Sequence, residues 1–466
     1  MVLRGVEGVH ERSRRRRGYF LAACLAALAM APAAASGAQA SSGHRVPASE
    51  EAIVIVSAAG AAMATGDVRA RLRGAVDDAG LELERSLPEI GIGSVDLPPG
   101  ETIAELRREL AGEPGVVAVE PNERLELRAA PNDPAYGSPD PEAPGGDIYQ
   151  WNLRKSGFVP AWGRSTGANA TVAVIDTGAE ADHPDLGPRI KDSFDHDGTP
   201  LAGPAGTDED GHGSHVSGLA CGEAGNGYGI AGAGYRCQLL IYKSDLTHAS
   251  ISESIVDAAD RGADVINMSF GGDGRSQAIE RAVSHAVERD VVLVAAASND
   301  DVTDQGIPAE YLQPQGSGSD ISRGDGLVVT AAQYDGSRAY FEPGHGTGIS
   351  LAAYGAAGRE GRGIFSSFPA GTTAIETTSL CLFCRANFQG DSRFAYLEGT
   401  SMATPQVAGA SALIRSRRPG MRAARVIRLL KLKADRSGGF SDELGWGVLD
   451  ANAAIRATLK RKKKKR

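Results

Sequence analysis

The sequence predicts an α/β protein with a mostly parallel central sheet and helices on both faces, preceded by a small α+β domain. The first reason is length, since 466 residues exceed one ordinary domain. The second is composition: 60 glycines and only 5% aromatic residues suit tight turns between strands and helices. The third is that apolar runs alternate with helical segments, and continuously apolar strands are typical of parallel sheets.

The first 40 residues have the pattern of a secretion signal. Arginines at 12 and 14–17 precede the apolar run YFLAACLAALAM, and AQA at 38–40 offers the small residues that signal cleavage needs. We expect cleavage after Ala40 and a secreted, extracellular protein. Two other export routes stay open, because RRGYFL is similar to a twin-arginine signal and LAAC to a lipoprotein cleavage box. The apolar run is too short to favour a spanning helix.

The use of cysteine agrees with export. Loss of the signal removes one of the five cysteines, and four cysteines in an exported chain predict two disulfides. Three connectivities exist, and the shortest loops are closed by pairing Cys221 with Cys237 and Cys381 with Cys384. A zinc site made of four thiolates is the competing interpretation. It is disfavoured because only one pair has the C-x-x-C spacing of zinc sites.

Charge is unevenly distributed along the chain. The signal segment is basic and the chain ends in KRKKKKR, so the body between them is more acidic than the net charge of −9 suggests. An acidic body argues against nucleic acid as a partner. The basic end could touch an anionic cell surface and hold the protein there, or it could be a solvated tail.

A compact segment with its own pattern of elements follows the signal. The apolar runs at 52–58 and 115–121 predict strands, and the periodic segments 67–80 and 101–112 predict amphipathic helices. We expect the order β-α-β-α-β. A stretch rich in Pro, Asn and Asp comes next and marks a domain boundary.

The remainder of the chain contains the predicted parallel sheet. Helical segments such as HVSGLA and SQAIERAVSHAVERD separate its apolar runs. In an open parallel sheet the chemistry gathers beyond the carboxyl ends of the strands, so the residues after each run are candidates for a site. The predicted strands are 171–178, 237–244, 263–270, 290–298 and 326–333.

Three such positions carry residues suited to nucleophilic catalysis. Asp176 ends the first run in VIDTG, His212 lies in EDGHGSHVSG, and Ser401 begins a helix in GTSMATPQVAG. A serine hydroxyl is a weak nucleophile until a neutral imidazole takes its proton, and a carboxylate must hold that imidazole in the right tautomer. Each residue alone has an ordinary explanation as a turn or helix cap. The three contexts together predict an Asp-His-Ser catalytic unit.

These motifs resemble the three signature blocks of the subtilisin family of serine peptidases, whose acid, base and nucleophile follow in the same order. The similarity extends over about residues 131–455. It implies a subtilisin-like peptidase domain at 130–457, with a basic tail at 458–466. Residues 41–129, which contain VAVEPN near their end, are similar to the family's inhibitory propeptide.

The resemblance implies a role for each residue that matches a motif. Asp176 would be the orienting acid, His212 the general base and then acid, and Ser401 the nucleophile. His215 matches the family's second, structural histidine. Asn299, in VAAASND, matches the asparagine that stabilises the oxyanion, and an ordinary turn-forming Asn is the alternative.

The resemblance also implies where a substrate would bind, as an added strand. SFGG at 269–272 matches the substrate-lining segment, and IPAE at 307–310 is similar to another pocket wall. The family usually has Gly where this chain has a serine before Asn299, so the preferred side chain at P1 stays open. The substrate-binding candidates are Ser269, Phe270, Gly271, Ala297 and Ser298.

Calcium is the one metal that the resemblance brings in, as a structural ion that the chemistry does not require. Asp185 in HPDL matches a family ligand, and Asn226 in GNGYGIAG could add another hard oxygen. Between Asn299 and Ser401 the chain is longer than is usual in the family. Its C-x-x-C predicts a surface insertion closed by a disulfide, with a redox-active motif as the alternative.

The sequence therefore predicts a secreted serine endopeptidase that cuts peptide bonds through an acyl-enzyme and is made as a self-processing zymogen. Its partners would be protein or peptide substrates and its own propeptide, acting as intramolecular chaperone and inhibitor. We expect a monomer. The alternative function is an inactive subtilisin-like binding module attached to the cell surface by the basic tail.

Overall fold

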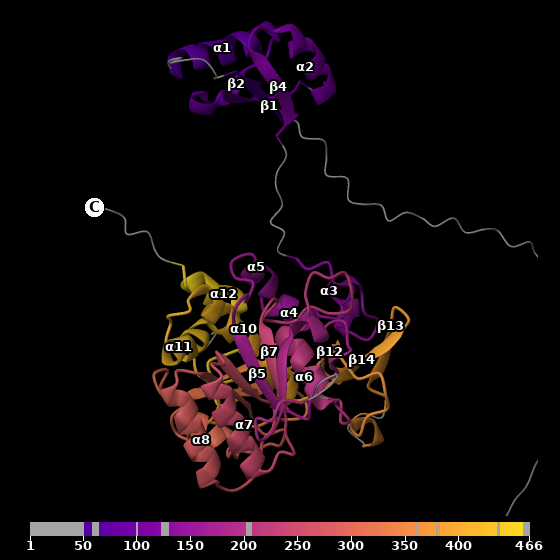
Figure 1. Ribbon diagram of the computed structural model, residues 1–466, viewed down its shortest axis with the longest axis vertical. Coiled ribbons are helices and arrows are strands. Elements are labelled where there is room, and N and C mark those ends of the chain that lie inside the picture. Colours follow the sequence, from indigo (N-terminus) through magenta and orange to yellow (C-terminus); the bar gives the residue numbers. More distant parts are fainter. Residues whose placement is uncertain are drawn as a thin grey trace, which may run out of the picture. The chain divides into compact units, whose positions relative to one another are not determined.

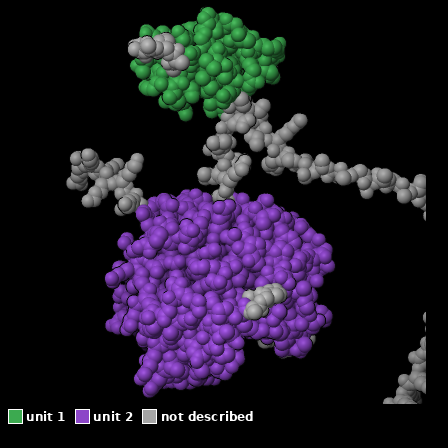
Figure 2. All heavy atoms as spheres, viewed as in Figure 1, with its two compact units in different colours: residues 1–125 green, residues 126–466 purple. Residues whose placement is uncertain are grey.

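The chain divides into two compact units, residues 1–125 and 126–466 (Figure 2). The predicted signal and most of the basic tail lie outside the described residues. None of the helices in the described part is long and apolar enough to cross a membrane. The computed structural model describes residues 51–57, 65–98, 101–122, 130–201, 207–359, 361–378, 381, 383–435 and 439–459.

The first unit is an antiparallel sheet of four strands in the order β2-β3-β1-β4, with two helices. Its chain order is β-α-β-β-α-β, so the expectation of one middle strand was wrong. The chain reverses at Gly91, which has a φ of 70°, and this turn makes a hairpin of two short strands. The elements are β1 (Glu51–Val56), α1 (Thr65–Asp78), β2 (Leu83–Leu87), η1 (Pro88–Ile90), β3 (Ile92–Asp96), α2 (Ile103–Glu109), η2 (Leu110–Gly112) and β4 (Val116–Pro121).

The two faces of this sheet differ. Ala52 and Val54 of β1 are fully buried in a core that includes residues of both helices. The alternate residues Ile53 and Ile55 are only half-buried. Val117 of β4 is 66% exposed. The sheet therefore has one packed face and a second face, with Ile53 and Ile55, that the described residues of this unit leave partly open.

The second unit is built on a sheet of seven strands in the order β11-β10-β9-β8-β5-β7-β6. Figure 1 labels two neighbours of this sheet, β5 and β7. All neighbouring strands run parallel, as predicted. Five strands match the predicted apolar runs, and the sequence singled out neither edge strand. The strands are β5 (Thr171–Asp176), β6 (Ile190–Asp195), β7 (Gln238–Lys243), β8 (Val265–Met268), β9 (Val292–Ala296), β10 (Gly326–Ala332) and β11 (Leu351–Tyr354).

Helices cover both faces of this sheet. Val172 and Val174 of β5 belong to one core, with side chains of α6 and α10, whereas Ala173 and Ile175 belong to another, with side chains of α7 and α8. Strands buried on both faces explain the continuous apolar runs. The helices are α3 (Pro134–Gly137), α4 (Trp151–Lys155), α5 (Phe158–Trp162), α6 (His212–Cys221), α7 (His248–Asp260), α8 (Gln277–Glu288), α9 (Ala309–Leu312), α10 (Thr400–Arg417), α11 (Ala423–Lys433) and α12 (Ala451–Ala457), with η3 (Pro144–Gly146), η4 (Gly187–Arg189) and η5 (Ile375–Thr377).

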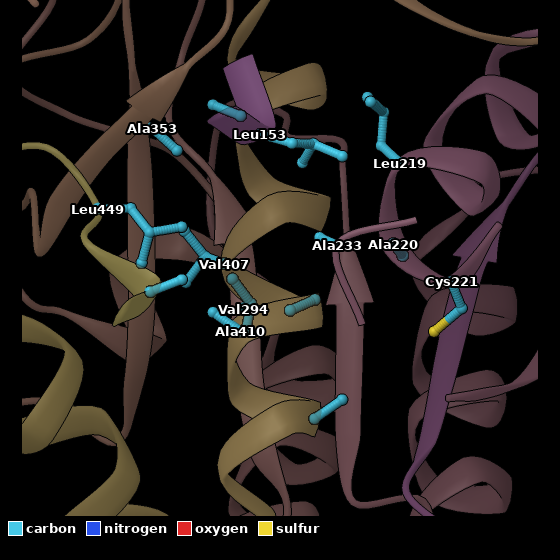
Figure 3. Packing of buried hydrophobic residues seen from close by; sticks show 14 of the residues in the cluster. Leu153, Leu219, Ala220, Cys221, Ala233, Val294, Ala353, Val407, Ala410 and Leu449 are labelled. Carbon is cyan, nitrogen blue, oxygen red and sulfur yellow. The ribbon is translucent and has the colours of Figure 1, made fainter. Parts of the chain in front are cut away.

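Helix α10 lies at the centre of the larger core. Figure 3 shows Val407 and Ala410 of this helix beside Val294 of β9, and all three side chains are buried in one cluster. Small residues on the helix allow this close packing. The start of α10, with Ser401, is therefore held rigidly against the sheet.

A small antiparallel sheet flanks the unit, with the order β12-β14-β13. Its strands are β12 (Ile364–Ser367), β13 (Arg385–Phe388) and β14 (Asp391–Leu397). The structure pairs Cys381 with Cys384 just before β13, and Cys221 with Cys237 between α6 and β7, with Cα atoms 4.9 and 5.5 Å apart. The two disulfides thus have the connectivity of the shortest loops.

Candidate active site

Asp176 and His212 come together where β5 ends and α6 begins. Asp176 is the last residue of β5 and only 2% exposed, and His212 is the first residue of α6. Nδ1 of His212 lies 2.7 Å from Oδ1 of Asp176, and the same oxygen accepts a hydrogen bond of 2.9 Å from the backbone N–H of Thr177. The carboxylate therefore fixes the imidazole through Nδ1 and leaves Nε2 free to accept or donate a proton.

The surroundings of His212 favour its protonated form. Burial by itself lowers the pKa of the imidazole, because it penalises a charged ring, but the charge and hydrogen bond of Asp176 outweigh this effect. The carboxylates of Asp208 and Asp210 act in the same direction. The net result raises the pKa of His212 above its ordinary value of 6.5.

Ser401 is the second residue of α10 and lies against the end of β8. Its Oγ donates a hydrogen bond of 2.8 Å to the carbonyl oxygen of Ser269. Among the residues that the structure describes, no hydrogen bond joins Ser401 to His212. A nucleophile and its base are often separated in the absence of substrate and meet only when the substrate binds.

Asn299 lies beside the start of α10, beyond the end of β9. Its Oδ1 accepts hydrogen bonds from N and Oγ1 of Thr400, at 2.9 and 3.0 Å, and Thr400 Oγ1 also reaches the carbonyl oxygen of Ala297 at 2.7 Å. The Asn299 residue is exposed, and its Nδ2 has no acceptor within the described ranges. Because Thr400 occupies the oxygen end, the amide N–H₂ group is the end that a bound molecule can use.

The predicted substrate-binding residues lie on two loops that follow β8 and β9. After β8, Phe270 is half-buried and Gly271 is exposed. After β9, Ala297 is buried and Ser298 is half-buried. The structure thus gathers these candidates at the carboxyl edge of the sheet, next to Ser269 and Ser401.

The IPAE segment joins the first of these loops. Gly272 and Ile307 form an antiparallel bridge, with N–H···O distances of 3.0 and 2.8 Å. Gln305, which the sequence did not single out, is 5% exposed, and its Oε1 accepts a hydrogen bond of 3.2 Å from the backbone of Ser298. Its Nε2 donates to the carbonyl oxygens of Val302 and His345. The Gln305 side chain thus connects the loop after β9 to the segment that contains His345.

His215 is fully buried and takes no part in this arrangement. Its Nε2 faces the carbonyl oxygens of Ile364 and Ala395 at 3.0 and 3.1 Å, so this nitrogen carries the proton. Burial lowers the pKa of His215 to about 3 and keeps the ring neutral. It holds β12 and β14 against α6, as a structural histidine would.

The predicted calcium residues lie together: Asp185 is fully buried, and Asn226 lies in an exposed turn beside it. Oδ1 of Asp185 accepts from Nδ2 of Asn226 at 2.9 Å, and Oδ2 accepts from the backbone of Ile230 at 2.8 Å. Asp133, which the sequence did not single out, is 1% exposed and has a buried Oδ1 without a partner within the described ranges. Burial, together with the charge of Asp133, raises the pKa of Asp185 to about 8.

This donor set fits a hard cation. Among the described residues, the buried carboxylates of Asp133 and Asp185 have no cationic partner, and carboxylate oxygens are ligands that Ca²⁺ prefers. The amide of Asn226 turns its nitrogen to Asp185, while its oxygen accepts a hydrogen bond of 2.8 Å from the backbone N–H of Tyr228. In the described part of the chain, no three His, Cys, Asp or Glu side chains are grouped so as to hold a metal. Any ion here would therefore depend on amide and backbone oxygens as well.

Comparison with known proteins gives one consistent result. A family model described as the subtilase family matches residues 167–447, more than half of the chain. Thermitase from Thermoactinomyces vulgaris is 28% identical over 333 residues, which cover 70% of this chain and 99% of thermitase. An extracellular protease from Xanthomonas campestris is 30% identical over 397 residues, covering 76% of this chain and 61% of that protein.

A solved structure shares the fold. A protease from Pseudoalteromonas arctica superimposes with a TM-score of 0.54 and 26% identity, covering 70% of this chain and 99% of its own.

Proposed function

This chain belongs to the subtilase family and is a serine endopeptidase, and from that premise we propose that Asp176, His212 and Ser401 perform the reaction. The observation that carries the proposal is the hydrogen bond of 2.7 Å between the buried Asp176 carboxylate and Nδ1 of His212. It leaves Nε2 as the nitrogen that can take a proton. Ser401 is the second residue of α10, the helix that packs on β5 and β8.

The first half of the reaction makes an acyl-enzyme. The Ser401 hydroxyl leaves the carbonyl of Ser269, gives its proton to Nε2 of His212 and attacks the peptide carbonyl carbon. A new Oγ–C bond forms and the carbonyl oxygen becomes an oxyanion. His212 then gives its proton to the amide nitrogen, the C–N bond breaks and the amine product leaves. In the second half, water loses a proton to Nε2 of His212 and attacks the acyl carbon. The Oγ–C bond then breaks as His212 returns that proton to Ser401 Oγ, and the acid product leaves.

Asn299 stabilises the oxyanion in this proposal. Thr400 holds the oxygen end of its amide, so Nδ2–H is directed at charge that develops during the attack. The backbone N–H of Ser401 is a second donor, since the first amides of a helix have no acceptor within the helix. Donors fixed in advance need no reorganisation when the charge appears.

Substrate would bind as an added strand at the loops after β8 and β9. Gly271 and Gly272 support this, because both are exposed and have no side chain, so a substrate backbone can approach closely. Phe270, Ala297 and Ser298 would line the pocket beside it. The hydroxyl of Ser298 accepts from the backbone N–H of Asp300 at 3.1 Å, so its position is set by the loop.

We infer that the first unit is an inhibitory propeptide and that the protein matures by cutting itself. The partly open face of its sheet, with the half-buried Ile53 and Ile55, suits a domain that docks on another surface. We expect the cut within 127–130, and 127–129 lie outside the described residues. Export through the signal at 1–40 and surface attachment through the tail belong to the same proposal.

Calcium is proposed as a structural ion, held by Asp133, Asp185 and Asn226 with loop carbonyls. Its contribution would be to neutralise two buried carboxylates and so stabilise the loop. It takes no part in the reaction.

The experiment that tests the function uses the chain from residue 41. The wild type should separate into two pieces, with the cut within 127–130, and should then hydrolyse a peptide library. Ser401→Ala should remain one covalent chain, because it lacks the nucleophile. If purified Ser401→Ala is processed as fast as the wild type, Ser401 is not the nucleophile of maturation.

A further inference from the structure

The residue before the first turn of α6 has no side chain with which to cap the helix. The N-cap is Gly211, with a φ of 98°, a conformation that L side chains rarely adopt. A Cβ at this position would lie 2.5 Å from Cε2 of Phe368, so the packing also excludes a side chain. The first N–H groups of α6 therefore need an acceptor from elsewhere.

Asp208 supplies this acceptor from three residues upstream. It is 3% exposed, and its Oδ1 accepts from the backbone N–H of Gly211 at 2.9 Å. Its Oδ2 accepts from the backbone N–H of Ser214 at 2.7 Å. A carboxylate at the start of a helix is also favoured by the helix dipole. Asp208 thus caps the turn of α6 that carries His212.

A third hydrogen bond connects this cap to the end of β5. Thr177 Oγ1 donates to Asp208 Oδ1 at 2.8 Å and accepts from the backbone N–H of Gly213 at 2.9 Å. The backbone N–H of Thr177 donates to Asp176 Oδ1 at 2.9 Å, the oxygen that also holds His212. A continuous network therefore runs from Asp208 to both residues of the Asp-His pair.

We propose that Asp208 is a positioning residue for catalysis: its carboxylate fixes the start of α6 against the end of β5 and so sets His212 relative to Asp176. This inference rests on the proposed function, since it takes these two residues as members of the reacting unit. Asp208 itself does not touch the substrate.

The network explains why the residue is a carboxylate. The backbone groups of Gly211 and Ser214 and the Thr177 hydroxyl are all donors, and an ionised carboxylate offers only acceptors. In Asp208→Asn the amide would set its own N–H₂ against one of these donors in a buried site, at the cost of an unsatisfied group. The first turn of α6 must then shift, and a misplacement of about 1 Å in an active site can cost about 100-fold in rate.

The test compares Asp208→Asn with Asp264→Asn in the mature enzyme. Asp264 precedes β8 at its amino end, the opposite edge of the sheet, and its Oδ2 accepts from the backbone N–H of Thr171 at 3.0 Å. Each variant loses a carboxylate that accepts backbone hydrogen bonds, but only Asp208 lies at the start of α6, beside His212. The readouts are the thermal midpoint and kcat and KM with a peptide substrate across a pH series, well below unfolding.

The expected result is a fall in kcat for Asp208→Asn on the alkaline plateau of about 10-fold or more, with KM nearly unchanged. On that plateau His212 is neutral, so the lost charge of Asp208 does not cause the fall. Asp264→Asn should lower the thermal midpoint and keep kcat. The proposal is overturned if Asp208→Asn behaves like Asp264→Asn, or if it only moves the acid limb of the pH profile and keeps the plateau.

If Asp208→Asn does not mature, the variants Thr177→Val and Thr177→Ser test the same network. Valine has the same shape without the hydroxyl, and serine keeps it. The proposal requires a lower kcat in the valine variant and recovery in the serine variant, and equal values in both overturn it. Activity that survives in Ser401→Ala would instead refute the proposed function, so the two failures are distinguishable.

Discussion

Ser401 and Ser269 hold each other through two reciprocal hydrogen bonds. Ser401 Oγ donates to the carbonyl oxygen of Ser269 at 2.8 Å, and Ser269 Oγ donates to the carbonyl oxygen of Ser401 at 2.9 Å. Nδ2 of the buried Asn267 donates to Ser269 Oγ at 3.0 Å and fixes its direction. The start of α10 is thereby attached to the end of β8, and these bonds hold Ser401, the proposed nucleophile, in place in the absence of substrate.

Ser269→Ala should loosen the start of α10. It removes the donor to the Ser401 carbonyl and should lower the free energy of unfolding by about 1 kcal/mol. It should also lower kcat, because the nucleophile is held less rigidly. Denaturant unfolding and steady-state kinetics measure the two effects. The matched control is Ser411→Ala, since Ser411 Oγ donates to the carbonyl of Val407 at 2.9 Å within the same helix. Equal loss of kcat in both variants would contradict a local role for Ser269.

Asn299→Ala should act on the chemical step. The amide donor is used mainly on charge that develops in the transition state, so kcat should fall by about 10²–10³ while KM changes little. Steady-state kinetics with a peptide substrate separate the two parameters. A rise in KM alone would assign Asn299 a binding or structural role.

The pH profile should follow the raised pKa of His212. Catalysis needs the neutral imidazole as base, so kcat/KM should be lost as pH falls through this pKa, above the ordinary value of 6.5. Asp176→Asn removes the main charge that raises the pKa, so the limb should move to lower pH. The plateau should fall by about 10⁴, because the tautomer is no longer held. An acid limb below that of free imidazole in the wild type would contradict the electrostatics described for this site.

Chelation should lower the thermal midpoint if the buried carboxylates hold calcium. An ion present at about 100 times its dissociation constant stabilises a protein by about 2.7 kcal/mol. Asp185→Asn should abolish the response to a chelator, whereas Asp264→Asn should keep it. Calorimetry with and without added Ca²⁺ measures the shift. A midpoint of the wild type that does not respond to chelator and calcium would remove the ion from the proposal.

The sequence by itself determined the fold class and the candidate residues of the site. Asp176 ends an apolar run that forms β5, and Asn299 follows the run that contains β9, so their placement at the carboxyl edge followed from the pattern alone. His212 and Ser401 lie in short motifs at helix starts, where the backbone conformation restricts which residues the sequence can have. Periodicity and helix starts are local properties, and the local sequence records them.

Only the tertiary structure decided which strands are neighbours and which polar groups meet. β5 lies between β7 and β8, an order that no local pattern contains. The hairpin of β2 and β3 was missed because both strands have only five residues, and β2, at the edge of the sheet, is half-exposed. Asp208 and Thr177 are far apart in the sequence, and Gln305 looks like an ordinary loop residue. Their roles come from hydrogen bonds to groups that folding brings close, and a buried polar group has its partner chosen by the packing around it.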